Sequence, residues 1–346
     1  MFKDPITVVG AGVMGLWQAL TLGRLGCQVT LIDSNKDPIQ NSTSRLAGTL
    51  LSPWTEAVAC PDIVRDLGIV GLNEWCANYP GVCKRGTLTL AAARDEQELF
   101  RFARMTKQHK FLDQANLRTL EPQIAERFNK ALFFSEEAHL TTPEALSFLM
   151  QATKSLGVKV TLGKTFRKTK QIGTIINCGG IAARDHLKDL RGVRGERLLV
   201  QTNEIQISRP IRLLHPRIPL YIVPWGGGRY IIGATMIESE DEGPITVRST
   251  LELLGAAYAL HPAFGEAQIL EMSSGIRPAF PDNIPRAKVV ADGKEIYVNG
   301  AYRHGFLLAP VLSQAVSNFL FKRSPHPLII VDAFTQEKSL VNSLAI

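Results

Sequence analysis

The order of apolar and polar positions predicts a strand, a tight turn, a helix and a second strand within the first 33 residues. The apolar segment Ile6–Val9 leads into Gly10-Ala-Gly12-Val-Met-Gly15, and an amphipathic stretch runs from there to Gly26. Val29–Asp33 is again apolar and ends in an acid. A strand–helix–strand unit of this kind is typical of the start of a parallel sheet.

The glycine turn has the G-x-G-x-x-G spacing of dinucleotide-binding proteins. Gly10 permits the tight turn, Gly12 leaves no side chain between the backbone and a pyrophosphate, and Gly15 lets the helix pack closely on the strand. The helix N-terminus offers N–H groups and the positive end of a dipole to phosphates. Asp33 ends the second strand, where a carboxylate can accept ribose hydroxyls. The pattern indicates a dinucleotide and leaves NAD and FAD open.

The remaining chain alternates between helix-like and strand-like patterns. The start Thr142-Pro-Glu144 combines an N-cap, a proline at the first helical position and an acid in the first turn, and Gly157 ends that helix. The predicted helices cover 62–78, 95–110, 142–156, 248–260 and 310–322, the last introduced by Pro310. The predicted strands cover 86–91, 158–162, 173–178, 220–225, 229–235 and 295–300.

Two features predict how these elements form domains. The strand that ends in Gly179-Gly180 is expected to be a further parallel strand with its carboxyl end at the ligand crevice, so the cofactor domain resumes near residue 141. Alternation between 198 and 236 predicts an antiparallel hairpin in a second domain. We therefore predict an α/β fold with a Rossmann-like dinucleotide-binding domain (1–82, 141–193 and 278–346) interleaved with an α+β, antiparallel-sheet substrate domain (83–140 and 194–277).

Composition excludes several classes of protein. With 346 residues, 45% hydrophobic and 21% charged, the chain is typical of a globular protein with a large core. No apolar run reaches 18 residues and the N-terminus leads directly into a strand, so we expect no membrane span, no signal peptide and a cytoplasmic location. Five cysteines without C-x-x-C spacing argue against a disulfide framework, and seven histidines without ligand spacing predict no metal site.

The net charge of +7 changes the picture only slightly. A basic protein suits an anionic cofactor and a carboxylate substrate, and it also raises the question of nucleic acid. The basic residues are scattered, and Lys164–Lys170 is their only dense run. We therefore expect no nucleic-acid partner, although contact with RNA stays open as an alternative.

Four motifs, spread over residues 6 to 310, carry a family resemblance. They are the glycine turn; Ser44-x-x-Ala-Gly48; Tyr221-Ile-Val-Pro followed by Gly-Ala-Thr-Met236; and Gly275-Ile-Arg277-Pro-x-x-Pro-Asp followed by Tyr302-Arg-His-Gly305-x-Leu-Leu-Ala-Pro310. In these residues and in their order the chain resembles the glycine oxidase and D-amino acid oxidase family of FAD-dependent amine oxidases, with the closest likeness to glycine oxidase.

The resemblance implies FAD extended across the Rossmann-like domain. Asp33 is expected at the adenosine ribose, the backbone around Phe166 at the adenine, residues 43–49 beside the pyrophosphate and the flavin ring, and residues 303–307 under the pyrimidine edge. The helix predicted to start at Pro310 is expected to direct its dipole there. Family members with covalent flavin use a late cysteine, and none follows Cys178, so the FAD is expected to be non-covalent. The residues implied at the cofactor are Gly10, Gly12, Met14, Gly15, Asp33, Thr43, Ser44, Ala47, Gly48, Thr49, Phe166, Gly179, Arg277, Arg303, His304, Gly305, Phe306 and Leu307.

The resemblance also implies a substrate pocket. Arg277 with Tyr221 is expected to hold the substrate carboxylate, because the planar guanidinium matches a carboxylate bidentately. Arg303 lies nearby and completes the set of catalytic residues, while Met236 is expected to be pocket wall. Simpler interpretations are a structural salt bridge for Arg277 and a core position for Tyr221. His304 is expected to be a local hydrogen-bonding residue.

The implied reaction is hydride transfer from the substrate Cα to flavin N5, imine hydrolysis, and reoxidation by dioxygen to hydrogen peroxide. Glycine, sarcosine, iminodiacetate and larger D-amino acids remain candidate substrates, and Trp225, where glycine oxidases often carry arginine, is expected to reshape the entrance. Alternatives are a D-amino acid or secondary-amine dehydrogenase that passes electrons to a carrier, a flavin-dependent tRNA-modification enzyme, and an NAD dehydrogenase. A homo-oligomer is possible.

Overall fold

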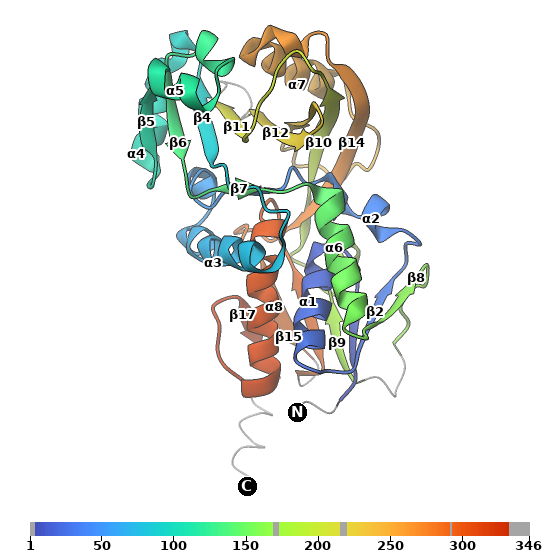
Figure 1. Ribbon diagram of the computed structural model, residues 1–346. Helices are drawn as coiled ribbons and strands as arrows, with labels where there is room; N and C mark the ends of the chain where they lie inside the picture. The colour runs from blue at the N-terminus through green and yellow to red at the C-terminus, as the bar shows by residue number, and fades with distance from the viewer. Residues whose placement is uncertain (1–3, 169–172, 215–219, 291–292, 332–346) are drawn as a thin grey trace. The chain divides into compact units, whose positions relative to one another are not determined.

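The computed structural model describes residues 4–168, 173–214, 220–290 and 293–331 (Figure 1). Contacts between residues divide the chain into two compact units, each assembled from separate segments. The first unit comprises Met1–Arg45, Thr142–Gly192 and Arg277–Ile346. The second comprises Leu46–Thr141 and Val193–Ile276.

The first unit is built on a sheet with the strand order β17-β15-β16-β9-β1-β2-β8 in the described part of the chain. The pairs from β16 through β9, β1 and β2 to β8 are all parallel, and β15 is antiparallel to β16. The bounds are β1 (Ile6–Val9), β2 (Val29–Asp33), β8 (Lys159–Leu162), β9 (Thr174–Asn177), β15 (Arg286–Val290), β16 (Glu295–Asn299) and β17 (Ile329–Val331).

Helices cover this sheet. Helix α1 (Val13–Arg24) packs on β1, β2 and β9 and against both α8 (Gly305–Lys322) and α6 (Thr142–Ser155). The Thr21 hydroxyl lies 2.8 Å from that of Ser313, which links α1 to α8. A short helix, α2 (Pro38–Asn41), follows β2, and Asp37 caps it. The predicted β1–α1–β2 unit and the predicted end of α6 near Gly157 agree with these bounds.

One helix begins earlier than the sequence pattern predicts. Helix α8 starts at Gly305 and contains Pro310, which we had expected to start it. Proline suits a first helical turn, but within a helix it removes only one backbone hydrogen bond when the surrounding packing holds the helix together. Here Pro310 and its neighbours are buried. The N-terminus of α8 therefore lies at Gly305, inside the glycine-containing motif.

The second unit contains a larger sheet, with the order β14-β10-β13-β12-β11-β4-β6-β5 among the described residues. Its recorded pairs are antiparallel except β11 with β4. The bounds are β4 (Thr87–Ala91), β5 (Lys110–Asp113), β6 (Lys130–Phe134), β10 (Arg191–Gln201), β11 (Ile211–Leu214), β12 (Leu220–Gly226), β13 (Arg229–Gly233) and β14 (Gln268–Ala279). A separate ribbon joins β3 (Leu50–Leu51) to β7 (Ala138–His139).

The helices of the second unit are α3 (Asp62–Asn78), α4 (Glu96–Met105), α5 (Gln114–Leu120) and α7 (Val247–Leu260). Leu253 and Leu260 of α7 pack on a buried cluster that includes Leu88, Leu198 and Ile232 from the sheet. The helix predicted to continue to 110 ends at Met105, because Lys110–Asp113 forms the edge strand β5 instead.

Residues 46–82 belong to the second compact unit, whereas we had assigned them to the cofactor domain. Two contacts explain the difference. Leu50 and Leu51 pair with β7, and Trp54 packs on the cluster around Phe134. The roles predicted for the two domains stay predictions.

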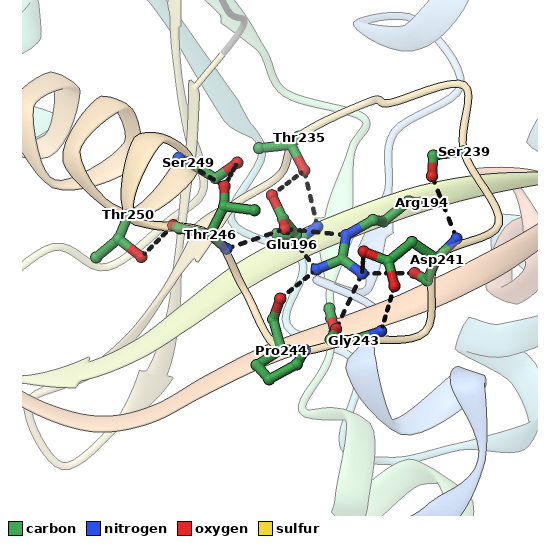
Figure 2. Close-up of polar contacts among 11 residues, drawn as sticks. Arg194, Glu196, Thr235, Ser239, Asp241, Gly243, Pro244, Thr246, Ser249 and Thr250 are labelled. Carbon is green, nitrogen blue, oxygen red and sulfur yellow. Dashed lines mark hydrogen bonds and ion pairs between the residues drawn. The ribbon is translucent and has the colours of Figure 1, made fainter.

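A buried ion pair fastens the segment between β13 and α7 to the second sheet (Figure 2). Arg194 is 2% exposed and donates to the Glu196 carboxylate at 2.8 Å and to the carbonyl oxygens of Asp241, Gly243 and Pro244. Glu196 is fully buried and also accepts the Thr235 hydroxyl at 3.2 Å. This pair therefore ties the segment between 235 and 244 to β10.

A parallel sheet with helices and a second, largely antiparallel sheet confirm the predicted α/β class with an α+β second unit. No helix in the part of the chain that the structure describes is both long and apolar enough to cross a membrane.

Candidate active site

The glycine turn at the end of β1 is closed against its neighbours by contacts that exclude a side chain. Gly10 has φ +95°, and a Cβ there would lie 2.6 Å from the carbonyl oxygen of Cys178 at the end of β9. A Cβ on Gly15 would lie 1.7 Å from the carbonyl oxygen of Gly10. Gly10 is thus required by its positive φ and by the close approach of the chain at the end of β9, and Gly15 by the backbone of the turn itself.

The third glycine stands at the N-terminus of α1. Gly12 is the N-cap residue and has no side chain to cap the helix. The Val13 N–H instead donates to the Ser44 hydroxyl oxygen at 3.0 Å, and a Cβ on Gly12 would meet that oxygen at 2.9 Å. Ser44 and the exposed Thr43 lie in a 3₁₀ turn of the first unit. The sequence-predicted pair Gly12 and Ser44 is therefore brought together.

Asp33 connects this turn to the end of β2. Its Oδ2 accepts the Ala11 N–H at 2.6 Å, and its Oδ1 accepts the Asn35 N–H at 2.7 Å. The Asp33 carbonyl accepts the N–H of Lys164 at 3.0 Å, so the segment that leads to the half-buried Phe166 runs beside it. The structure brings the two residues predicted at the adenosine end of the cofactor to one edge of the sheet.

A second helix N-terminus lies beside the first. A Cβ built on Gly305, the first residue of α8, would lie 3.6 Å from Ala301 and 3.8 Å from the Val13 side chain. Neither α1 nor α8 has an acid in its first turn. Met14, Phe306 and Leu307 are buried beside these termini.

These features fit a dinucleotide. Two adjacent helix N-termini present backbone N–H groups and positive dipole ends, and the glycines leave the backbone uncovered by side chains. An anionic pyrophosphate suits this environment better than a neutral ligand. The donor set therefore fits the cofactor that the sequence motif indicates.

The two C-terminal motifs meet in the first unit. Ala279 forms a β-bridge with Ala301, and the Tyr302 N–H donates to the Pro278 carbonyl at 2.8 Å. These contacts place the chain around the half-buried Arg277 beside the chain that leads to the half-buried Arg303. His304 is buried, and its N–H donates to the Ala301 carbonyl at 2.8 Å.

Asn299 is a structural residue of this region that the sequence analysis missed. Its Nδ2 donates to the Gly180 carbonyl at 2.8 Å, and its Oδ1 accepts the Gly300 N–H at 2.8 Å. Asn177 does the equivalent for the Gly179 N–H at 2.9 Å. The signal was present, because both asparagines end apolar strands just before a glycine turn.

The predicted substrate residue Tyr221 lies on β12 of the second unit and is 6% exposed. It packs with Val223 and Leu50, and its hydroxyl donates to the carboxylate of Glu56. Nη1 of Arg212 lies 3.9 Å from the same carboxylate. Neither Glu56 nor Arg212 was predicted, although an arginine within the apolar strand Ile211–Leu214 is a signal that a buried charge has a partner.

Four other predicted site residues belong to the second unit: Ala47, Gly48 and Thr49 lie near its start, and Met236 follows β13. Gly48 has room for a Cβ, whose closest contacts would be Ile231 at 3.9 Å and Val223 at 4.0 Å. Thr49 is buried with φ +52°, and its hydroxyl donates to the Leu140 carbonyl. Ala47 is half-buried, and Met236 is 43% exposed.

Two titratable groups near this cluster are shifted by burial. Burial raises the pKa of Glu137 to about 7, although the hydroxyl and the N–H of Thr55 donate to its carboxylate. Burial, with the positive charges of Arg85 and Arg209, lowers the pKa of His139 to about 4. Both side chains lie on or next to β7.

The chain is similar to FAD-linked oxidoreductases over almost its full length. The profile of a family described as FAD dependent oxidoreductase matches residues 5–318. A protein of Rhizobium etli named putative thiamine biosynthesis oxidoreductase ThiO is 46% identical, with 93% of this chain and 98% of that protein aligned. The glycine oxidase of Geobacillus kaustophilus is 22% identical over 92% of this chain and 93% of its own. The crystal structure of glycine oxidase from the same species has a TM-score of 0.78, covering 95% of this chain and 97% of that one at 20% identity.

Proposed function

Because this chain belongs to the family of FAD-dependent oxidoreductases, we propose that it oxidises glycine, or a closely related small amino acid or secondary amine, at its Cα–N bond. Family membership confirms the predicted FAD cofactor and the predicted class of enzyme. That the FAD is held without a covalent bond stays a prediction.

The first unit supports the binding of FAD. We assign the pyrophosphate to the N-terminus of α1, where Gly12 and Ser44 lie, and the pyrimidine edge of the flavin to the N-terminus of α8. Bound FAD supplies a two-electron acceptor that takes a hydride from the substrate. The dipole of α8 would favour negative charge at the edge of the flavin that is assigned to its N-terminus.

The substrate proposal rests on Arg277. This half-buried arginine stands on β14 where the two C-terminal motifs meet, and its fork can bind a carboxylate through two parallel hydrogen bonds. Arg303 adds a second positive charge from the adjoining motif, and Tyr221 and Met236 are assigned to the pocket. Held by its carboxylate, an amino acid is oriented so that its Cα–H rather than its amine is presented for transfer.

Arg277→Lys tests this assignment. A lysine keeps the charge but loses the planar fork, so we expect KM for the amino acid to rise about 100-fold. The flavin absorbance spectrum should stay unchanged, since the replaced group holds substrate. Steady-state kinetics with the preferred substrate checks both expectations, and an unchanged KM would remove Arg277 from the site.

The electron acceptor and the substrate are tested together. We propose dioxygen as acceptor and hydrogen peroxide as product. A peroxide-coupled screen of glycine, sarcosine, iminodiacetate and D-amino acids should give turnover with at least one small amine. Turnover only with an artificial electron-accepting dye, and without peroxide, would indicate the alternative of a dehydrogenase. Salt-dependent retention of tRNA by the purified protein would support the tRNA-modification alternative.

The name of the Rhizobium etli relative suggests a pathway for this enzyme as well. We propose that this enzyme serves thiamine biosynthesis, supported by 46% identity over nearly the full length of both chains. Disruption of the gene should produce a requirement for thiamine that the wild-type protein relieves and Arg277→Lys does not. The predicted cytoplasmic location and a possible homo-oligomer stay predictions.

A further inference from the structure

The hydroxyl of Tyr221 stands in a row of buried polar groups that crosses the second sheet. Tyr221 on β12 is directly opposite Arg212 on β11, and Arg212 is opposite Thr89 on β4. Side chains opposite each other in register share one face of a sheet. The Arg212 guanidinium carbon lies 5.2 Å from the centre of the Tyr221 ring and 4.7 Å from that of Phe102.

Glu56 approaches this row from outside the sheet. It begins a 3₁₀ turn (Glu56–Ala59), is 7% exposed, and accepts the proton of the Tyr221 hydroxyl. Arg212, itself 6% exposed, donates to the Thr55 carbonyl and lies 3.9 Å from the Glu56 carboxylate. The arginine thus holds the backbone just before Glu56 and offsets its charge.

A second buried carboxylate binds the same turn. The Glu137 carboxylate is 1% exposed and accepts the Trp54 N–H at 3.0 Å and the Thr55 N–H at 2.6 Å, together with the Thr55 hydroxyl. Thr55 is therefore held by Arg212 through its carbonyl and by Glu137 through its donors. The position of the next residue, Glu56, follows from that.

A purely structural ion pair in the same unit looks different. The Arg209 Nε donates to Glu121 at 2.9 Å, and its other nitrogens donate to the carbonyls of Arg85 and Leu120 and to the Ser208 hydroxyl, which itself donates to Glu121. In that pair the two charges are in direct contact and no tyrosine takes part. In the Glu56 pair the charges are farther apart, and the carboxylate accepts a tyrosine hydroxyl.

Burying charged groups costs several kcal/mol per ion, and apolar side chains of equal volume often stabilise a protein as well or better. Stability alone does not explain why Glu56 and Arg212 are both buried beside one phenol. We propose that Glu56, held in place by Arg212 and by the Glu137-bound turn, is a positioning residue: by accepting the proton of the Tyr221 hydroxyl, it leaves the phenol oxygen as an acceptor for the substrate amine. This inference rests on the proposed function, in which Tyr221 faces the substrate.

A double-mutant cycle on KM tests the proposal. Tyr221→Phe removes the hydroxyl, and Glu56→Gln keeps the shape of the side chain but removes its charge. We expect each to raise KM for the substrate found in the screen about 10-fold, and the double variant to raise it no further than either single variant, because both changes act through one hydroxyl. kcat should change less than KM in Glu56→Gln.

Glu121→Gln is the matched control, since it weakens the equivalent Arg209 pair in the same unit. It should lower the melting temperature, leave KM unchanged, and combine with Tyr221→Phe by simple multiplication. If Glu56→Gln does not fold, Arg212→Lys replaces it in the cycle; it keeps the positive charge but loses the stacking on Tyr221 and Phe102. The proposal requires that variant also to be non-multiplicative with Tyr221→Phe.

The possible outcomes distinguish a failure of the proposed amine oxidation from a failure of the role proposed for Glu56. Wild-type protein that oxidises none of the screened amines defeats the proposed function and, with it, the basis of this inference. Active wild-type protein whose single effects on KM multiply in the double variant defeats the inference alone. A Glu56→Gln variant that loses thermal stability but keeps its KM would likewise reduce Glu56 to a structural residue.

Discussion

The two units hold their polar groups in position by different means. In the first unit the placement is done by the backbone: Gly10 and Gly15 leave no room for a Cβ, and the N-termini of α1 and α8 lie side by side. In the second unit it is done by buried charges, with Arg194, Arg212 and Glu137 each binding backbone groups of a neighbouring segment.

This difference explains why the glycine turn of the first unit could be predicted from the sequence, whereas the buried charge contacts of the second unit could not. A glycine requirement is local, so its spacing stands in a short motif. The partners in the second unit are far apart along the chain, 165 positions for Tyr221 and Glu56 and 157 for Arg212 and Thr55. The backbone at Gly10 and Gly15 also leaves no room for an added atom, whereas the stability of a buried charge depends on the balance between its desolvation and its pairing.

Gly15→Ala tests the backbone side of the comparison most severely. The new Cβ would stand 1.7 Å from the Gly10 carbonyl oxygen, which cannot move without opening the turn. We expect a loss of more than about 3 kcal/mol of stability, and little folded protein. Gly255→Ala in α7 is the control, because a Cβ there meets nothing within 4 Å. Equal urea midpoints for the two variants would contradict the backbone argument.

Gly12→Val separates cofactor binding from folding. Its Cβ would contact only the Ser44 hydroxyl, and a side-chain atom of that kind can rotate away. We therefore expect a folded protein that has lost FAD affinity by about 1000-fold or more, roughly 4 kcal/mol. Flavin absorbance after gel filtration, set against the melting temperature of the apoprotein, measures both. A variant that is still yellow refutes the pyrophosphate assignment.

Arg194→Met examines the charge side of the comparison. It leaves the fully buried Glu196 without its partner, so we expect a loss of about 3–5 kcal/mol in urea unfolding. Adding Glu196→Gln should recover part of that loss, because the uncompensated charge is removed. Arg65→Met, which breaks pairs with the exposed Asp62 and Asp66, is the control and should cost at most about 1 kcal/mol. Similar losses at Arg65 and Arg194 would end the distinction.

Glu137→Gln tests how the buried carboxyl group affects the dependence of stability on pH. The pKa of Glu137 rises from 4.5 to about 7 on folding, so its contribution to stability is lost as pH rises through that window. The pKa of His139 falls from 6.5 to about 4, so its contribution is lost as pH falls through that window. In the wild type the two trends oppose each other.

In the Glu137→Gln variant, the pH dependence of stability should therefore show the effect of His139 alone. We expect its stability to rise by on the order of 3 kcal/mol between pH 4 and pH 6.5, while the wild type changes much less. Urea unfolding at several pH values measures this, with His139→Asn expected to show the converse trend. Parallel stability curves for the wild type and Glu137→Gln would mean that Glu137 does not titrate in this range.

The fold was predictable where a periodic pattern coincided with strong end signals. The β1–α1–β2 unit and α6 lie where glycine, proline and acid signals predicted them, and α3 lies where the spacing of apolar residues predicted it. Strand β5 was missed because Lys110–Asp113 is short and largely exposed, as suits an edge strand, and resembles the end of the charged helix before it. The start of α8 was missed because Pro310 is tolerated inside a helix whose neighbouring residues are all buried.

The placement of Gly12 beside Ser44, and of Arg277 beside the second C-terminal motif, could be predicted from short motifs. Residues that act through another residue could not be predicted, since Glu56 and Asn299 have ordinary neighbours in the sequence. Their meaning depends on which side chain or carbonyl lies opposite, and this is decided by the register of strands that are far apart in the chain. The catalytic assignments of Arg277, Arg303 and Tyr221 stay predictions for the kinetic tests.

The strand order of the first sheet has a consequence for synthesis on the ribosome. Strand β16 lies next to β9, but the second segment of the second unit and strand β15 come between them in the chain, so β9 keeps an open edge until about 120 more residues have been made. At roughly 5–20 residues per second, that wait lasts about 6–24 seconds. Helix α8 emerges later still, so the nascent chain acquires its full cofactor cradle only near the end of translation.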